Sequence, residues 1–230
     1  MLIWCPNSLV ECTKTIIPQP KTGFFMFSTR EDTDRIRSAI TATFESKGFH
    51  LINAMALTGS EDNYCKICEQ ILSTAFGVAL ITKDTPHESL HNIYLEIGLA
   101  RAFGKEALIL TPDIKSVTTD LAGKGVLPYK SEDEMKQKII TWTEQIPKRV
   151  HDYNTHAEIA LTELNDYEKF FDYSKKAIMF GDFSTPIKEL NAVFNSKKPI
   201  NHNISKRLQS EAKVFLKCVK RENKRGKRAP

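Results

Sequence analysis

Short apolar runs recur along the first half of the chain, and longer stretches with helical spacing lie between them. The apolar runs cover residues 23–28, 49–54, 75–82, 107–110 and, more briefly, 126–129. Runs of this length that end at polar or turn residues predict buried strands. In the stretches between them apolar residues recur every three or four positions, and this spacing continues over residues 132–145. Such spacing predicts helices with one apolar face.

This alternation of strands and helices determines the expected fold class. A strand, a helix and a parallel strand form a right-handed crossover, so we expect an α/β fold with a parallel sheet and helices on both of its faces. Ligands of such sheets bind outside the carboxyl ends of the strands. The loops expected at that edge are residues 28–34, 53–60 and 83–92.

One carboxylate stands out against its apolar surroundings. Residues 91–103 are apolar on nearly every side of a helical wheel, which is typical of a buried helix, and Glu96 is the only acid among them. Burial disfavours the charged form of a carboxyl group and raises its pKa, which is how many enzymes prepare an acid, a base or a nucleophile. The alternative is that Glu96 reaches solvent or pairs with Arg101 and has only a structural role.

The pattern changes beyond Pro147. Helical spacing is found at residues 154–171, 174–180 and 204–219, with breaks expected at Gly181-Asp182 and Thr185-Pro186. The last residues, 220–230, are expected to be frayed and solvated. We therefore divide the chain into an irregular lead-in at 1–22, an α/β domain at 23–146 and a helical region at 147–230.

Charge is distributed unevenly along the chain. The formal net charge is +5, but residues 197–230 hold 12 Lys and Arg against 2 Glu, so the remainder of the chain carries −5. The basic end is either a solubilising, disordered tail or an electrostatic surface for nucleic acid or a nucleoprotein partner. The cations expected to form that surface are Lys206, Arg207, Lys213, Lys217, Lys220 and Arg221.

Composition excludes several classes of protein. With 27% charged and 41% hydrophobic residues the chain is typical of soluble globular proteins, and no apolar run approaches the ~20 residues of a membrane helix. The first residues lack the basic segment of a signal peptide, so we expect a cytoplasmic protein without a membrane partner. Cys65 and Cys68 have a spacing used by zinc ligands, but the same spacing places them on one helix face, and we expect packed thiols and no metal.

Three segments resemble a known superfamily. Residues 27–35, FSTREDTDR, are similar to the segment that follows the first strand of Toll/interleukin-1 receptor (TIR) domains. Residues 92–105, NIYLEIGLARAFGK, are similar to the glutamate-bearing helix of nucleoside 2-deoxyribosyltransferase-like proteins, and residues 119–129 resemble a segment found after the fourth strand in that group. The region from Gly23 to about Trp142 thus resembles the prokaryotic TIR-like and deoxyribosyltransferase-like group.

The resemblance implies a flavodoxin-like nucleotide-binding domain that uses NAD as substrate and needs no further cofactor. Glu96 takes the position of the catalytic glutamate. The first loop is expected to line the ribose and phosphates, and an aromatic residue is expected to stack on the nicotinamide or base. The binding residues that the resemblance implies are Phe27, Ser28, Thr29, Arg30, Asn92 and Tyr94. Two departures are Ile93-Tyr94-Leu95 where TIR enzymes usually place a Trp-Cys pair, and Glu106 after Lys105 where the group has proline.

The chemistry of an N-glycosidic bond suits a single carboxylate. When the base leaves, the ribose gains oxocarbenium character, which a nearby carboxylate stabilises or attacks. We therefore expect a TIR-like NAD glycohydrolase, an effector of bacterial antiviral defence that is activated by self-association or by a partner. The alternatives are a nucleoside or nucleotide N-glycosidase or deoxyribosyltransferase, and a non-catalytic module that senses a nucleotide or mediates TIR–TIR contacts.

Overall fold

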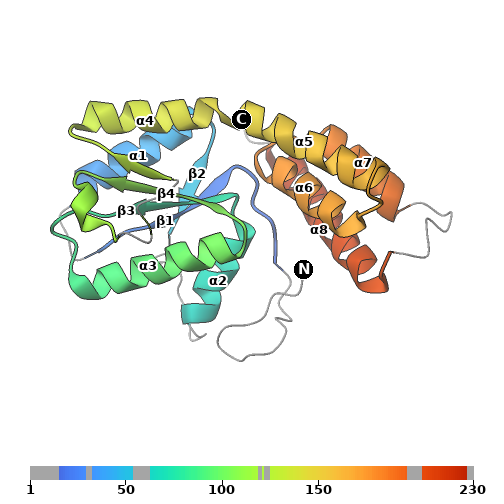
Figure 1. Cartoon of the computed structure of the whole chain (residues 1–230), viewed down its shortest axis with the longest axis horizontal. Coiled ribbons are helices and arrows are strands. Elements are labelled where there is room, and N and C mark those ends of the chain that lie inside the picture. The colour runs from blue at the N-terminus through green and yellow to red at the C-terminus, as the bar shows by residue number, and fades with distance from the viewer. Residues whose placement is uncertain are drawn as a thin grey trace. The chain divides into compact units, whose positions relative to one another are not determined.

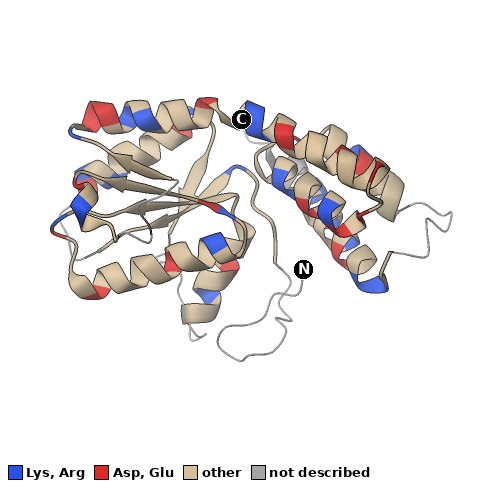
Figure 2. Cartoon of the chain, viewed as in Figure 1, with Lys and Arg blue, Asp and Glu red and all other residues tan. Residues whose placement is uncertain are grey.

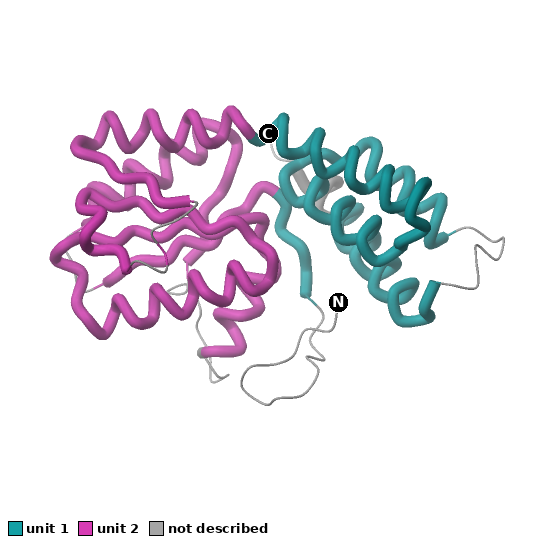
Figure 3. The backbone as a smooth tube through the Cα atoms, viewed as in Figure 1, with its two compact units in different colours: residues 1–20, 146–230 teal, residues 21–145 magenta. Residues whose placement is uncertain are grey.

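The chain forms two compact units in the computed structural model, which describes residues 16–29, 33–53, 63–118, 121, 125–195 and 204–226. The first unit is Lys21–Gln145 and the second comprises the described parts of Ile146–Pro230 with residues 16–20 (Figure 3). The change of pattern near Pro147 thus falls beside the junction of the two units. Pro147 itself lies in the first turn of a helix, where its missing N–H costs no hydrogen bond.

The first unit is built on a parallel sheet of five strands. The strands are β1 (Thr22–Met26), β2 (His50–Ile52), β3 (Phe76–Leu80), β4 (Glu106–Thr111) and β5 (Val126–Pro128). Their order across the sheet is β2-β1-β3-β4-β5, and every neighbouring pair is parallel (Figure 1). This is the strand order of flavodoxin-like folds, so the expected α/β class is confirmed.

Helices cover both faces of this sheet. One face is covered by α1 (Asp34–Ser46) and α4 (Glu132–Glu144), and the other by α2 (Asn63–Ser73) and α3 (His87–Ala102) (Figure 1). On the α1 side the rings of Phe44 and Trp142 lie 5.5 and 5.0 Å from that of Phe76. The core beneath α2 and α3 contains Phe24 and Met26. Side chains of a strand point alternately to its two faces, so Phe25 of β1 points to the α1 side.

Helix α3 departs from the expectation in two ways. It begins at His87, so His87 and His91 lie on the helix and not in the preceding loop. It is also not buried all round: Ile93, Ile97 and Ala100 are buried, but the opposite side is exposed, with 48% of Leu95 accessible. Helix α3 thus packs on the sheet with one side only, and the apolar residues on its other side are accessible to solvent.

Four helices form the second unit: α5 (Ile146–Thr162), α6 (Tyr167–Met179), α7 (Thr185–Phe194) and α8 (Lys206–Gly226). The single helix expected over 154–171 is wrong, because Asn165 adopts a left-handed φ of 53° and the Asp166 carboxylate accepts a hydrogen bond from the Lys169 N–H to begin α6. The break expected at Thr185-Pro186 is instead the start of α7. The frayed end expected at residues 220–230 is wrong for residues 220–226, because α8 extends to Gly226, and residues 227–230 lie outside the described residues.

Aromatic packing joins these helices. Phe171 of α6 contacts Phe194 of α7 and Phe215 of α8, with ring centroids 6.0 and 5.7 Å away. All three rings are at least nine-tenths buried. In the part of the chain that the structure describes, no helix is both long and apolar enough to cross a membrane.

Candidate functional site

The strand order creates a topological switch point at the carboxyl edge of the first unit, and we call this part of the edge the crevice. β1 and β3 are neighbours in the sheet, but the chain leaves β1 for α1 on one face and leaves β3 for α3 on the other. The connections diverge at this point, and the gap between them is where flavodoxin-like folds hold their ligands. Residues from the end of β1 and from the first three turns of α3, which include Glu96, therefore form the candidate site.

Glu96 lies on the third turn of α3 and is half-buried. Burial raises the pKa of its carboxyl group from 4.5 to about 7. The carboxylate makes no hydrogen bond or ion pair with any other described residue, and Arg101, the partner considered from the sequence, makes no ion pair with it. Near neutral pH the group therefore exchanges a proton readily, as a reacting carboxyl group must.

Ser28 joins the end of β1 to the start of α3. It is buried, and its hydroxyl donates a hydrogen bond to the Ser89 hydroxyl over 3.0 Å. Ser89 precedes Glu96 by seven residues, which places both on one helix face about 10 Å apart along the axis. Asn92 lies between them, exposed and one turn before Glu96. The structure thus brings Ser28, Asn92 and Glu96 to one side of α3.

Phe27 is not brought to Glu96. Its ring lies 4.9 Å from that of Phe25, which faces α1, and the Arg37 guanidinium of α1 stands 4.4 Å above it. Because Phe27 follows Met26 along the strand, it points to the face opposite α3. In this conformation the ring stacks on an arginine of α1 and not on a ligand beside Glu96.

Tyr94 is also directed away from Glu96. Two residues along a helix differ by about 200°, so the two side chains leave α3 on opposite sides. The Tyr94 hydroxyl donates a hydrogen bond to the Ser116 carbonyl over 3.0 Å, which ties α3 to the short η2 helix (Ile114–Ser116) after β4. Tyr94 therefore stabilises the segment after β4.

The rest of the predicted loop is only partly described. Thr29 is exposed immediately after Ser28. Arg30 lies outside the described residues, as do residues 54–62, which include most of the second loop expected at this edge. Their expected contacts with ribose and phosphate therefore stay predictions.

Ser89 is the residue that the sequence pattern did not identify. The segment 87–90 carries three polar residues and lies within the loop predicted at 83–92, although Glu88 suits the first turn of a helix. Extending the helix backward by one turn would have placed Ser89 on the same face as Glu96. Among the described residues, no three His, Cys, Asp or Glu side chains lie together as a metal site requires.

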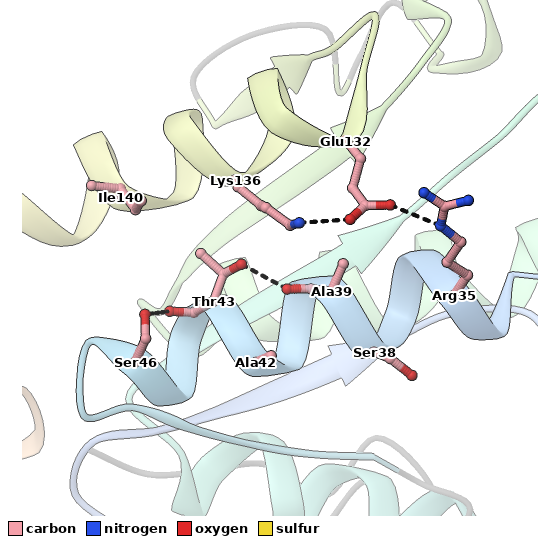
Figure 4. Close-up of a pocket in the computed structure, with 9 residues that line it drawn as sticks. All are labelled: Arg35, Ser38, Ala39, Ala42, Thr43, Ser46, Glu132, Lys136 and Ile140. Carbon is pink, nitrogen blue, oxygen red and sulfur yellow. Dashed lines mark hydrogen bonds and ion pairs between the residues drawn. The ribbon is translucent and has the colours of Figure 1, made fainter.

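A second, open groove of about 570 Å³ lies between α1 and α4, on the opposite face of the sheet from Glu96 (Figure 4). Its one carboxylate, Glu132, receives a hydrogen bond from Arg35 over 3.1 Å and an ion pair from Lys136 over 2.6 Å. Lys136 and Arg35 hold the pKa of Glu132 below its usual range. This acid stays ionised at neutral pH, so the groove lacks the poised carboxyl group found in the crevice.

No protein-family model and no curated protein matches this chain.

Proposed function

We propose that this chain is a cytoplasmic TIR-like enzyme that cleaves the N-glycosidic bond between nicotinamide and ribose in NAD. The observation that carries the proposal is a single half-buried glutamate without a polar partner, Glu96, on the helix that follows β3 at the switch point of a flavodoxin-like sheet. The similarity of residues 92–105 to the glutamate-bearing helix of the deoxyribosyltransferase-like group supports the same assignment.

The reaction needs one anionic group and one water. The bond between C1′ and the nicotinamide nitrogen breaks, and its electron pair neutralises the pyridinium, so the leaving group departs without a proton. Positive charge then develops on the ribose, where the Glu96 carboxylate stabilises it or forms a transient ester with C1′. Water adds to C1′ and releases one proton, which completes the hydrolysis to ADP-ribose.

Binding of NAD is expected to shift Glu96 from its protonated form to the carboxylate. A pKa of about 7 leaves much of the free enzyme protonated at neutral pH, yet the reaction requires the anion. The pyridinium of NAD is a cation, and an opposite charge within a few ångströms favours the charged form of a carboxyl group. Binding of NAD beside Glu96 therefore lowers its pKa and produces the reactive form.

The raised pKa also favours a second candidate, a nucleoside N-glycosidase or deoxyribosyltransferase. A neutral purine or pyrimidine leaves more easily when it is protonated, and a carboxyl group with a pKa near 7 is a suitable proton donor. The two candidates differ in the state of Glu96 that reacts. An NAD glycohydrolase uses the carboxylate, so its rate rises with pH, whereas a general acid loses its proton and its rate falls.

The test is release of nicotinamide from NAD by the purified full chain, with and without added nucleic acid. Three proteins are compared: wild type, Glu96→Gln, and Glu45→Gln as the matched control, because Glu45 is an exposed glutamate of α1. The proposal predicts release by wild type and by the control but not by Glu96→Gln, with all three equally folded. Loss of release in both variants would contradict a specific role of Glu96.

If wild type releases no nicotinamide, the protein is incubated with a panel of nucleosides and release of the free base is measured. This experiment distinguishes the second candidate from a non-catalytic module. Base release that depends on Glu96 supports the N-glycosidase. Nucleotide binding without turnover in either protein would overturn both enzymatic assignments. Dependence of the rate on protein concentration tests the self-association that the TIR resemblance implies.

A further inference from the structure

We propose that the outer face of α8 binds nucleic acid duplexes through their phosphates, independently of base sequence. Helix α8 has two different sides. Its apolar residues are buried in the second unit, and its cations are exposed on the opposite side. The buried residues are Leu208, Ala212, Phe215, Leu216 and Val219, and the exposed cations are Lys206, Arg207, Lys213, Lys217, Lys220 and Arg221.

The cations form a continuous row. With 3.6 residues per turn, all of them except Arg207 fall within about 100° of the helix circumference. From Lys206 to Arg221 the row is about 22 Å long, at 1.5 Å per residue. In Figure 2 the Lys and Arg residues of α8 are blue. We call these six cations the basic face.

Few groups of the protein neutralise this face. Lys206, Lys213, Lys217 and Arg221 make no ion pair with any residue that the structure describes. Lys220 donates a hydrogen bond to the neutral Asn191 side chain over 2.9 Å. The described acid of α8, Glu211, lies at the edge of the buried side and reaches Lys175 of α6 at 4.0 Å. The positive charge is therefore directed to solvent.

The other helices of the second unit, α5 to α7, have no such face among the described residues. Helices α5 and α6 carry acidic and basic residues in nearly equal number, whereas α8 carries eight Lys and Arg against two Glu. Salt bridges such as that of Lys169 with Asp166 occupy part of the charge on α6. The excess of cations on one rigid helix is thus a local property and not a consequence of overall composition.

The chemistry of the basic face favours nucleic acid over a membrane. A helix that inserts into a membrane surface needs free large apolar residues, but those of α8 are packed against α6 and α7. Val214, with 42% exposed, is the one large apolar residue that α8 presents to solvent among those the structure describes. A protein partner would also need an apolar or aromatic anchor at the centre of the contact.

Apart from its cations, the face offers few groups that read bases. Among the described side chains of α8, Ser210 is the only exposed polar residue without charge, and no aromatic ring is exposed for stacking on bases. A duplex carries one phosphate about every 1.7 Å of its axis when both strands are counted, so a stretch of about 22 Å carries about 13 phosphates, more than the row has cations. Five or six cations can then each displace a counterion, which gives weak, salt-dependent binding.

The test is the binding of a labelled 20-base-pair duplex to the full chain, followed by fluorescence anisotropy at several salt concentrations. Two unrelated DNA sequences and one RNA duplex are compared. We expect similar affinities for the two DNA sequences, and a slope of log K against log salt near −4.5 for five phosphate contacts. Affinity should fall about 500-fold between 50 and 200 mM salt.

A matched pair of double variants isolates the basic face. Lys213→Gln with Lys217→Gln removes two of its charges, and Lys148→Gln with Lys169→Gln removes two exposed charges from α5 and α6. The first pair should make the slope shallower by about 2, and the second should leave it unchanged. Glutamine keeps the helix propensity of lysine, and circular dichroism checks the fold.

Three results would overturn the proposal: no duplex binding at 50 mM salt, an equal loss in both double variants, or binding that is confined to vesicles containing phosphatidylserine. The measurement needs no turnover, so its failure is distinguishable from failure of the N-glycosidase assignment.

Discussion

The two units place their functional charges in opposite environments. In the first unit one carboxyl group, Glu96, is half-buried without a polar partner, so its environment changes its chemistry. In the second unit the cations of the basic face are exposed to water on the outside of α8. A buried charge acts individually and responds to pH, whereas a row of solvated charges acts as a sum and responds to salt.

The largest expected effect is on catalysis. Glu96→Gln should lower the rate of nicotinamide release by about 10²- to 10⁴-fold, because the amide cannot supply the negative charge that the transition state requires. Steady-state kinetics should show this loss in kcat with KM little changed. The prediction would be contradicted if Glu45→Gln lost the same rate of nicotinamide release, or if Glu96→Gln lost less than about tenfold. In either case the half-buried glutamate would have no greater role in the reaction than an exposed one.

The same substitution should stabilise the protein at high pH. The native state holds a proton on Glu96 that the unfolded chain has released between pH 4.5 and about 7, so wild-type stability falls as the pH rises through this range. Glu96→Gln should then exceed wild type by at most about 3 kcal/mol at pH 8, and the gain should vanish near pH 4. Urea unfolding at the two pH values measures the difference, and a gain that is independent of pH would contradict the raised pKa.

The basic face should show the converse response. Duplex binding should change strongly with salt but by less than about twofold between pH 6 and 8, because lysine and arginine stay charged throughout this range. Nicotinamide release should change with pH much more than with salt. If duplex affinity changed with pH in the same way as the rate of nicotinamide release, the basic face and Glu96 would not act independently.

The smallest expected effect concerns the support of the crevice. Ser28→Ala removes the hydrogen bond to Ser89 and should lower the free energy of unfolding by about 1 kcal/mol. Ser46→Ala is the matched control, because the Ser46 hydroxyl bonds only to the Thr43 carbonyl within α1. The crevice model predicts that Ser28→Ala reduces nicotinamide release and that Ser46→Ala does not. Equal activity of the two variants would remove Ser28 from the site.

The sequence predicts the strands of the sheet better than it predicts which side chains lie near Glu96. Apolar runs are interpretable as strands because a parallel sheet buries both faces, and the five strands appear where these runs occur. For the same reason the runs carry no alternation that would tell which face a residue meets. Phe27 could therefore not be assigned to the α1 side from sequence.

The helix boundaries depend on local conformations that composition specifies only weakly. Asn165 adopts a positive φ and ends α5, yet an asparagine inside a helical pattern rarely marks a break by itself. The first turn of α3 is polar, and His87 and Glu88 in it are exposed, so apolar periodicity does not identify this turn or Ser89. Glu96 was identifiable because one acid among apolar residues is a strong local signal.

The most direct test of the account is the pH profile of kcat/KM for nicotinamide release from NAD by wild-type protein. The account predicts a rate that increases tenfold per pH unit in the acid range and levels off above a midpoint of about 7, the pKa of Glu96 in the free protein. A midpoint near 4.5, a rate that falls as the pH rises, or no release at any pH would contradict it.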